Sequence, residues 1–135
     1  MGTICFVILN YKTWREAAAC AESILKTQQG QDIRIVLVDN GSGNGSEESL
    51  REEFAGEKRV HVIASEKNLG FARGNNLGIR YARSHFEPDF IVAANSDIIF
   101  EQEDYCEKLR EIYKEERFDI LGGDIVDACL LYTSD

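Results

Sequence analysis

The stretch Glu66-Lys-Asn-Leu-Gly-Phe-Ala-Arg-Gly-Asn-Asn-Leu-Gly-Ile79 is the most informative part of this chain. It places Gly70, Gly74 and Gly78 at intervals of four residues among polar side chains. Inside a helix, glycine costs roughly 1 kcal/mol relative to alanine, and asparagine is also a poor helix former. Because a helix that only packs would avoid these residues, we expect close backbone approach and amide hydrogen bonds here.

Outside this stretch, short apolar runs alternate with segments of helical periodicity. We expect strands at residues 3–9, 33–38, 60–64 and 89–94, helices at residues 14–25, 72–84 and 103–116, and the start of a fifth strand at Ile120 and Leu121. Thr13 and Glu16 have the spacing of a capping box at the first helix. Strands that alternate with helices indicate an open, mostly parallel α/β sheet covered on both faces.

Polar residues follow the ends of the expected strands. Asn10, Asp39, Ser65 and Asn95 each lie at or just past such an end. Since parallel sheets bind ligands at the carboxyl ends of their strands, we expect these four residues to share one rim of the sheet. The sequence therefore suggests a site for a phosphorylated ligand and a metal at that rim.

Composition restricts the function further. A chain of 135 residues favours one compact domain, and a net charge of −9 makes a general nucleic-acid binder improbable. No segment approaches the roughly 18 apolar residues of a membrane span. The scattered cysteines, without a Cys-x-x-Cys pair, indicate reduced, buried thiols in a cytoplasmic protein.

Each polar motif has a functional and a purely structural interpretation. Val38-Asp39-Asn40-Gly41-Ser42 can hold a ribose or a base, or it can be an ordinary turn after a strand. Asn95-Ser96-Asp97 can hold Mg²⁺ or Mn²⁺, or its aspartate can cap a turn. Neither the dinucleotide fingerprint nor a P-loop is present.

Taken together, the motifs resemble those of the family 2 glycosyltransferases, in particular the rhamnosyltransferase-like branch. The matching motifs are Val7-Ile-Leu-Asn-Tyr11, Val38-Asp-Asn-Gly-Ser42, Asn68-Leu-Gly-Phe-Ala-Arg-Gly-Asn-Asn-Leu-Gly78 and, as an Asn-x-Asp form of the family's DxD motif, Asn95-Ser96-Asp97. The resemblance implies a GT-A fold, a Rossmann-like three-layer α/β/α arrangement with a mostly parallel sheet. It assigns residues 1–127 to the part that binds a nucleotide sugar. Residues 128–135 stay unassigned, with a non-native tail as one interpretation.

The same resemblance implies the site residues. The nucleotide would be contacted by Asn10, Tyr11, Asp39, Asn40, Ser42, Gly70, Arg73, Gly74 and Asn75. Asp97, with Asn95 nearby, would coordinate Mg²⁺ or Mn²⁺ on the diphosphate. Because Asn95 replaces the first aspartate of the strict DxD pattern, we expect only one direct carboxylate ligand from this motif.

The activity implied is metal-assisted transfer of a sugar, with inversion, from a UDP- or dTDP-sugar to a hydroxyl acceptor on a cell-surface glycan or lipid-linked precursor. Only 38 residues follow Asp97, so we expect a C-terminally truncated domain that lacks the catalytic base. The full-length protein is expected in the cytoplasm, including the inner face of the membrane. A sugar nucleotidyltransferase and a non-catalytic nucleotide-sugar-binding or interaction module remain as alternatives; donor sugar, acceptor and oligomeric state are open.

Overall fold

The computed structural model describes residues 2–117, 124–126 and 131–133. Clustering of the backbone divides the chain into two compact units, Met1–Asp104 and Tyr105–Asp135. The assignment of residues 1–127 to one domain stays a prediction.

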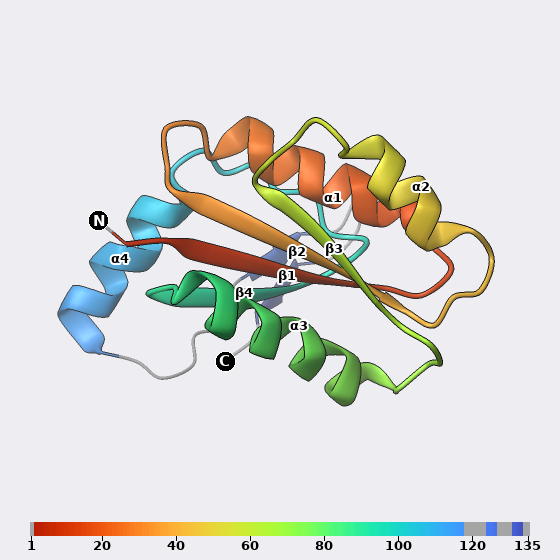
Figure 1. Cartoon of the computed structure of the whole chain (residues 1–135). Coiled ribbons are helices and arrows are strands. Elements are labelled where there is room, and N and C mark those ends of the chain that lie inside the picture. The colour runs from red at the N-terminus through yellow and green to blue at the C-terminus, as the bar shows by residue number, and fades with distance from the viewer. Residues whose placement is uncertain (1, 118–123, 127–130, 134–135) are drawn as a thin grey trace. The chain divides into compact units, whose positions relative to one another are not determined.

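The first unit is a four-stranded parallel sheet with helices on both faces (Figure 1). Its elements are β1 (Ile4–Asn10), α1 (Trp14–Thr27), β2 (Ile33–Asn40), α2 (Ser46–Glu53), β3 (Val60–Ser65), α3 (Phe71–Phe86) and β4 (Phe90–Asn95). The strand order is β3-β2-β1-β4, with every pair parallel. Helices α1 and α2 cover one face, and α3 covers the other. The α/β fold class is confirmed, and all four expected strands and the three expected helices are present.

Alternation along the two central strands builds a separate core on each face. Val7 and Val38 belong to the apolar cluster that packs with Ala82 of α3. Because successive side chains of a strand point to opposite faces, Phe6 and Leu37 lie on the face that α1 covers, and both are fully buried. The central strands are therefore buried on both sides, as their uninterrupted apolar sequences predicted.

The glycines of α3 bring this helix unusually close to the sheet. A Cβ atom added to Gly78 would lie 2.5 Å from Val7 Cγ1 and 2.7 Å from Val38 Cγ2. At Gly74 it would lie 2.8 Å from Leu9 Cδ1 and 2.9 Å from Asn40 Nδ2. The close backbone approach expected from the spacing of these glycines is confirmed, and its immediate reason is helix–sheet packing.

The start of α1 differs from the expected capping box. Thr13 is the N-cap residue, yet its side chain makes no capping hydrogen bond to the helix. Its hydroxyl instead donates to Asn10 Oδ1, 3.2 Å away. The prediction was wrong: Thr13 is held instead by Asn10, three residues before it, whose Oδ1 accepts from both the backbone N–H and the hydroxyl of Thr13.

The second unit contains α4 (Tyr105–Glu116) and the antiparallel pair β5 (Asp124–Val126) and β6 (Leu131–Thr133). Helix α4 agrees with the expected helix to within two residues at its start. The strand expected at Ile120 and Leu121 lies outside the described residues, as does most of the segment 128–135.

The thiols of Cys5, Cys20 and Cys106 are buried, as predicted, while Cys129 is outside the described part. Burial raises the pKa of the Cys5 thiol to about 12, although the nearby Arg34 opposes the rise. Such thiols stay protonated and unreactive at neutral pH. Among the described residues, no helix combines the length and apolar character needed to cross a bilayer.

Candidate functional site

The polar strand ends meet at one rim of the sheet, as expected. The register pairs Asn10 with Asp39 and Leu9 with Asn95, and it pairs Asn40 with Ser65. From β1 the chain proceeds to β2 and β3 on one side and then returns to β4 on the other side. The carboxyl ends of β1 and β4 therefore form the topological switch point, which is where open α/β sheets bind their ligands.

Asp39 lies at the centre of a hydrogen-bond network on the face that α1 covers. Its carboxylate is buried, and Oδ1 accepts from Asn10 Nδ2 at 3.1 Å and from the Ser42 hydroxyl at 2.5 Å. The Ser42 oxygen in turn accepts from the backbone N–H of Lys12 at 2.8 Å. Asp39 Oδ2 takes no hydrogen bond from the described residues. One carboxylate oxygen is thus fixed by the protein, and the other is available to a donor on a ligand.

Asn10 connects this network to the start of α1. Its Oδ1 accepts from the Thr13 backbone N–H at 3.0 Å and from the Thr13 hydroxyl at 3.2 Å. The Thr13 hydroxyl also lies 3.4 Å from the hydroxyl of Ser96, in the turn after β4. Sequence reasoning did not assign Thr13 and Ser96 to the site. Their position in the sequence could have identified them, since each follows the end of a strand by one to three residues.

Asn40 faces the opposite side of the sheet and is fully engaged by the protein. Its Nδ2 donates to Asn68 Oδ1 at 3.0 Å and to the Gly70 carbonyl at 3.2 Å. Its Oδ1 accepts from the Leu69 backbone N–H at 3.0 Å and from the Ser65 hydroxyl at 3.3 Å. These bonds hold the loop before α3 against the end of β2. Direct contact of Asn40 with a nucleotide stays a prediction, and positioning of the loop is its visible role.

The turn after β4 is more exposed to solvent than the ends of β1 and β2. Asn95 and Asp97 are both exposed, and neither side chain has a hydrogen bond or ion pair with the described residues. Asp97 nevertheless acts on α1: burial raises the pKa of the Cys20 thiol to about 12, and the charge of Asp97 adds to the rise. The Asp97 carboxylate, which is expected to bind the metal, is therefore exposed to solvent and has no ion-pair partner among the described residues.

The other expected nucleotide contacts are distributed around the start of α3 and the end of β1. Tyr11 is exposed beside Lys12, whose Nζ lies 5.2 Å from the centre of the tyrosine ring. Gly70 is the N-cap residue of α3, and Arg73 is exposed in its first turn. Asn75 is buried, and its Oδ1 has neither accessible surface nor a hydrogen-bond partner.

Two of the predicted residues lie on opposite faces of the sheet. Gly74 packs on Leu9 and Asn40 beneath the sheet, whereas Asp39 lies with Asn10 on the α1 face. Strands in a sheet are about 5 Å apart, so the ends of β2 and β4, two strands apart, are about 10 Å from each other. Asp39 and the Asn95–Asp97 turn therefore share one rim, and Gly74 packs against that rim from the face that α3 covers.

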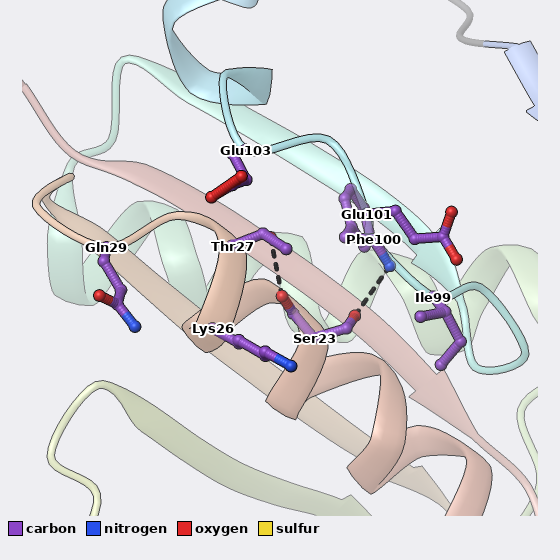
Figure 2. A pocket seen from close by; sticks show the side chains of 8 residues that line it. All are labelled: Ser23, Lys26, Thr27, Gln29, Ile99, Phe100, Glu101 and Glu103. Carbon is purple, nitrogen blue, oxygen red and sulfur yellow. Dashed lines mark hydrogen bonds between the residues drawn. The ribbon is translucent and has the colours of Figure 1, made fainter.

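A cavity of the sheet unit lies away from the rim. It has a volume of about 820 Å³ and is lined by the second half of α1 and by residues 99–103 (Figure 2). The Ser23 hydroxyl accepts from the Phe100 backbone N–H at 2.8 Å and so joins the two walls. Its charged residues are Lys26, Glu101 and Glu103. Because α1 runs away from the rim and two carboxylates line the cavity, it is poorly suited to a diphosphate.

Asp97 is the carboxylate expected to bind a metal ion. The described residues contain no group of three or more His, Cys, Asp or Glu side chains able to hold a metal ion. A single accessible carboxylate still fits Mg²⁺ or Mn²⁺, because these ions are commonly bound by one or two carboxylates together with substrate phosphates. Asp97 matches that mode of binding, which needs the ligand's own oxygens.

Comparisons with known proteins agree with this architecture. The family model of glycosyl transferase family 2 matches residues 5–130. The glycosyltransferase GlyG of Streptococcus pneumoniae is 33% identical over 121 residues, which are 90% of this chain and 38% of GlyG. The chain thus spans little more than a third of that relative's length.

Solved structures show the same fold at low sequence identity. The complex of S. aureus TarS (residues 1–349) with UDP-GlcNAc superposes with a TM-score of 0.69 and 18% identity, covering 87% of this chain and 32% of TarS. The Pyrobaculum calidifontis mannosyltransferase PcManGT, in complex with GDP-Man and Mn²⁺, gives a TM-score of 0.62 at 15% identity, over 75% of this chain and 29% of PcManGT. With the family match over nearly all of its sequence and a sheet of the GT-A type, this chain belongs to glycosyltransferase family 2.

Proposed function

We propose that this chain is the donor-binding region of a glycosyltransferase that uses a UDP- or dTDP-sugar. The observation that carries the proposal is the state of Asp39. Its carboxylate is buried at the rim, with Oδ1 fixed by Asn10 and Ser42 and Oδ2 without a donor. Oδ2 is not among the buried atoms that lack a partner, so it is reachable and can accept a hydrogen bond from an N–H or O–H donor of a ligand.

Uracil and thymine both carry a ring N–H between two carbonyl groups, and the ribose adds hydroxyl donors. Either donor satisfies Asp39 Oδ2. The exposed ring of Tyr11, at the adjoining end of β1, offers a flat surface for the base. Guanine also presents N–H donors, so Asp39 by itself does not select the base, and the choice of UDP or dTDP rests on the family resemblance.

We assign the diphosphate to the part of the rim formed by the start of α3 and by Asp97. The first turn of α3 contains no acidic residue, and its N-terminus and Arg73 both favour an anion. Asp97 would hold a Mg²⁺ or Mn²⁺ ion together with diphosphate oxygens. When bound, the ion stabilises negative charge on the departing diphosphate.

This chain's own residues then bind and orient the donor. Inversion requires a base that deprotonates the acceptor hydroxyl on the face opposite the leaving group. We propose that this base and the acceptor pocket are contributed by segments that the relatives have beyond the length matched here. A cell-surface glycan or lipid-linked precursor is the proposed acceptor.

Calorimetry with a panel of nucleotides tests the proposal. UDP or dTDP with Mn²⁺ should bind and should raise the melting temperature, because a ligand that binds only the folded form stabilises it. Tighter binding of GDP or ADP than of UDP and dTDP would exclude a UDP- or dTDP-sugar as the donor. A folded sample that gives no heat with any pyrimidine nucleotide would support a non-catalytic interaction module. Release of pyrophosphate from a nucleoside triphosphate and a sugar 1-phosphate would indicate a nucleotidyltransferase instead.

A further inference from the structure

The outer face of α3 is basic, in contrast to the rest of the protein. Helix α3 contains Arg73, Arg80 and Arg83 and no aspartate or glutamate. The chain as a whole has 24 acidic and 15 basic residues. On an acidic protein, an ordinary solvated helix face would mix the two signs of charge, as α2 does with Glu47 and Arg51.

Helical spacing places the polar residues of this face together. Residues three, four and seven positions apart lie on one side of a helix, so Arg73, Asn76 and Arg80 form one row, and Arg83 continues it. All four are exposed. From Arg73 to Arg80 the row extends about 10 Å along the helix, at 1.5 Å per residue.

Within the described part of the chain, the arginines of this row lack the carboxylate partners that three other arginines have. Arg34, Arg51 and Arg59 each form an ion pair, with N–O distances of 2.9, 2.9 and 2.8 Å. Among the residues that the structure describes, Arg73, Arg80 and Arg83 form none. Their guanidinium groups therefore keep all their donors for an external anion.

A small cavity lies within this row. It has a volume of about 150 Å³ and is lined by Leu69, Arg73, Asn76, Leu77 and Arg80. Sites for drug-sized ligands begin at about 300 Å³, so this cavity is too small for a nucleotide sugar and suits a single compact group. Two guanidinium groups and an amide around two leucines favour a phosphoryl group, since arginine binds phosphate through paired N–H donors.

We propose that this α3 pocket, defined by its five lining residues, binds the phosphoryl group of a second ligand, distinct from the nucleotide donor. The α3 pocket is lined by the exposed Arg73, Asn76 and Arg80 of the helix that covers one face of the sheet, whereas Asp39 lies with Asn10 on the opposite face. Only Arg73, at the start of α3, belongs to both sets of residues. The phosphoryl group can come from a soluble phosphate ester or from a lipid headgroup, and the chemistry at the arginines is the same.

The test is a titration of isotope-labelled protein with inorganic phosphate and glycerol 3-phosphate at low salt, followed by NMR. Backbone amide shifts should be concentrated in residues 69–84 and should weaken as salt is added. Arg80→Gln should lower the affinity roughly tenfold or more, because it removes charged hydrogen bonds to the anion. The matched control is Arg51→Gln, which removes the same charge from α2 and should leave the affinity unchanged.

Two further measurements separate the possibilities. UDP binding should be retained in Arg80→Gln, so loss of the α3 pocket is distinguishable from loss of the donor site. Sedimentation with phosphatidylcholine vesicles, with and without phosphatidylglycerol, identifies the source: binding that requires the anionic lipid and is lost in Arg80→Gln indicates a headgroup. The proposal would be overturned if phosphate caused no change in the amide chemical shifts, or if the changes were centred on Asp39. It would also be overturned if Arg80→Gln bound phosphate as tightly as the wild-type chain.

Discussion

Asp39 and Asn40 are neighbours in the sequence, yet they face opposite sides of the sheet and use their polar atoms differently. Asn40 satisfies both its amide hydrogens and its oxygen within the protein, through Ser65 and the loop 68–70. Asp39 satisfies one oxygen and leaves the other open. The comparison separates a residue that builds the rim from one that is ready for a ligand, although both are typical turn residues.

The largest expected effect is on stability, at Asn40. Asn40→Leu removes four hydrogen bonds from a buried side chain and releases the loop before α3 from the end of β2. We expect the free energy of unfolding to fall by about 3 kcal/mol. Urea denaturation measures it, with exposed Gln29→Ala as the control at less than about 0.5 kcal/mol. An equal, small loss in both variants would contradict the building role of Asn40.

The next effect is on binding, at Asp39. Asp39→Asn keeps an oxygen for Asn10 and Ser42, but it replaces the open Oδ2 with an N–H₂ group that opposes a ligand donor. We expect UDP or dTDP affinity to fall by about 2 kcal/mol, with a smaller change in stability. Calorimetry measures the affinity, and Asp32→Asn, at an exposed surface ion pair, is the control. Unchanged affinity would remove Asp39 from the donor site.

A smaller effect is expected at Asp97. Since its side chain is exposed and without a partner among the described residues, Asp97→Ala should leave the metal-free melting temperature unchanged. It should remove the Mn²⁺-dependent gain in UDP affinity, which we expect to be about tenfold, or 1.4 kcal/mol. Glu103→Ala, another exposed carboxylate, should keep that gain. Retention of the gain in Asp97→Ala would exclude Asp97 as a metal ligand.

The smallest effect lies away from the rim, at His61. Its ring packs 4.7 Å from the Phe86 ring, and burial lowers its pKa, with the positive charges of Arg34 and His85 adding to the shift. Because the folded pKa is below the unfolded value of about 6.5, the unfolded state binds more protons in this range. Stability should therefore decrease as the pH falls below about 6.5 towards the folded pKa.

Urea midpoints between pH 5 and 7.5 measure this dependence. In His61→Gln the decline should become shallower, while His85→Gln should retain most of it. If His61→Gln shows the same decline as the wild-type chain, carboxylates rather than His61 determine the pH dependence. Donor binding should be unaffected in both variants, because His61 is in β3 near the C-terminal end of α3, away from the rim.

Much of the fold follows from local sequence. Continuous apolar runs such as residues 33–38 identified buried parallel strands, and the same runs ended at the polar residues that form the rim. The glycines of α3 predicted close approach, and Gly78 provides it against Val7 and Val38. The capping box at Thr13 was wrong, because the Thr13 hydroxyl donates to Asn10 Oδ1, a short-range contact that the capping-box pattern does not include.

The candidate site was predictable as a set of residues but not in the role of each. The sequence placed Asn40, Gly74 and Asp39 together as nucleotide contacts. Strand alternation then puts Asn40 on the face that α3 covers, where Gly74 packs against it, and Asp39 on the face that α1 covers. No motif records which face a residue at a strand end will take. Nor did the sequence predict that the arginines of α3 would lack ion-pair partners, because pairing depends on the charges that other elements bring near.

The sequence by itself determined the order of strands and helices, the glycines that let α3 pack closely and the polar residues that end each strand. These properties depend on short-range periodicity and on backbone geometry. Only the tertiary structure decided that Asp39 keeps a free oxygen while Asn40 has none. That difference depends on hydrogen-bond partners 25 or more residues away in the chain, which meet only when the parallel strands are in register.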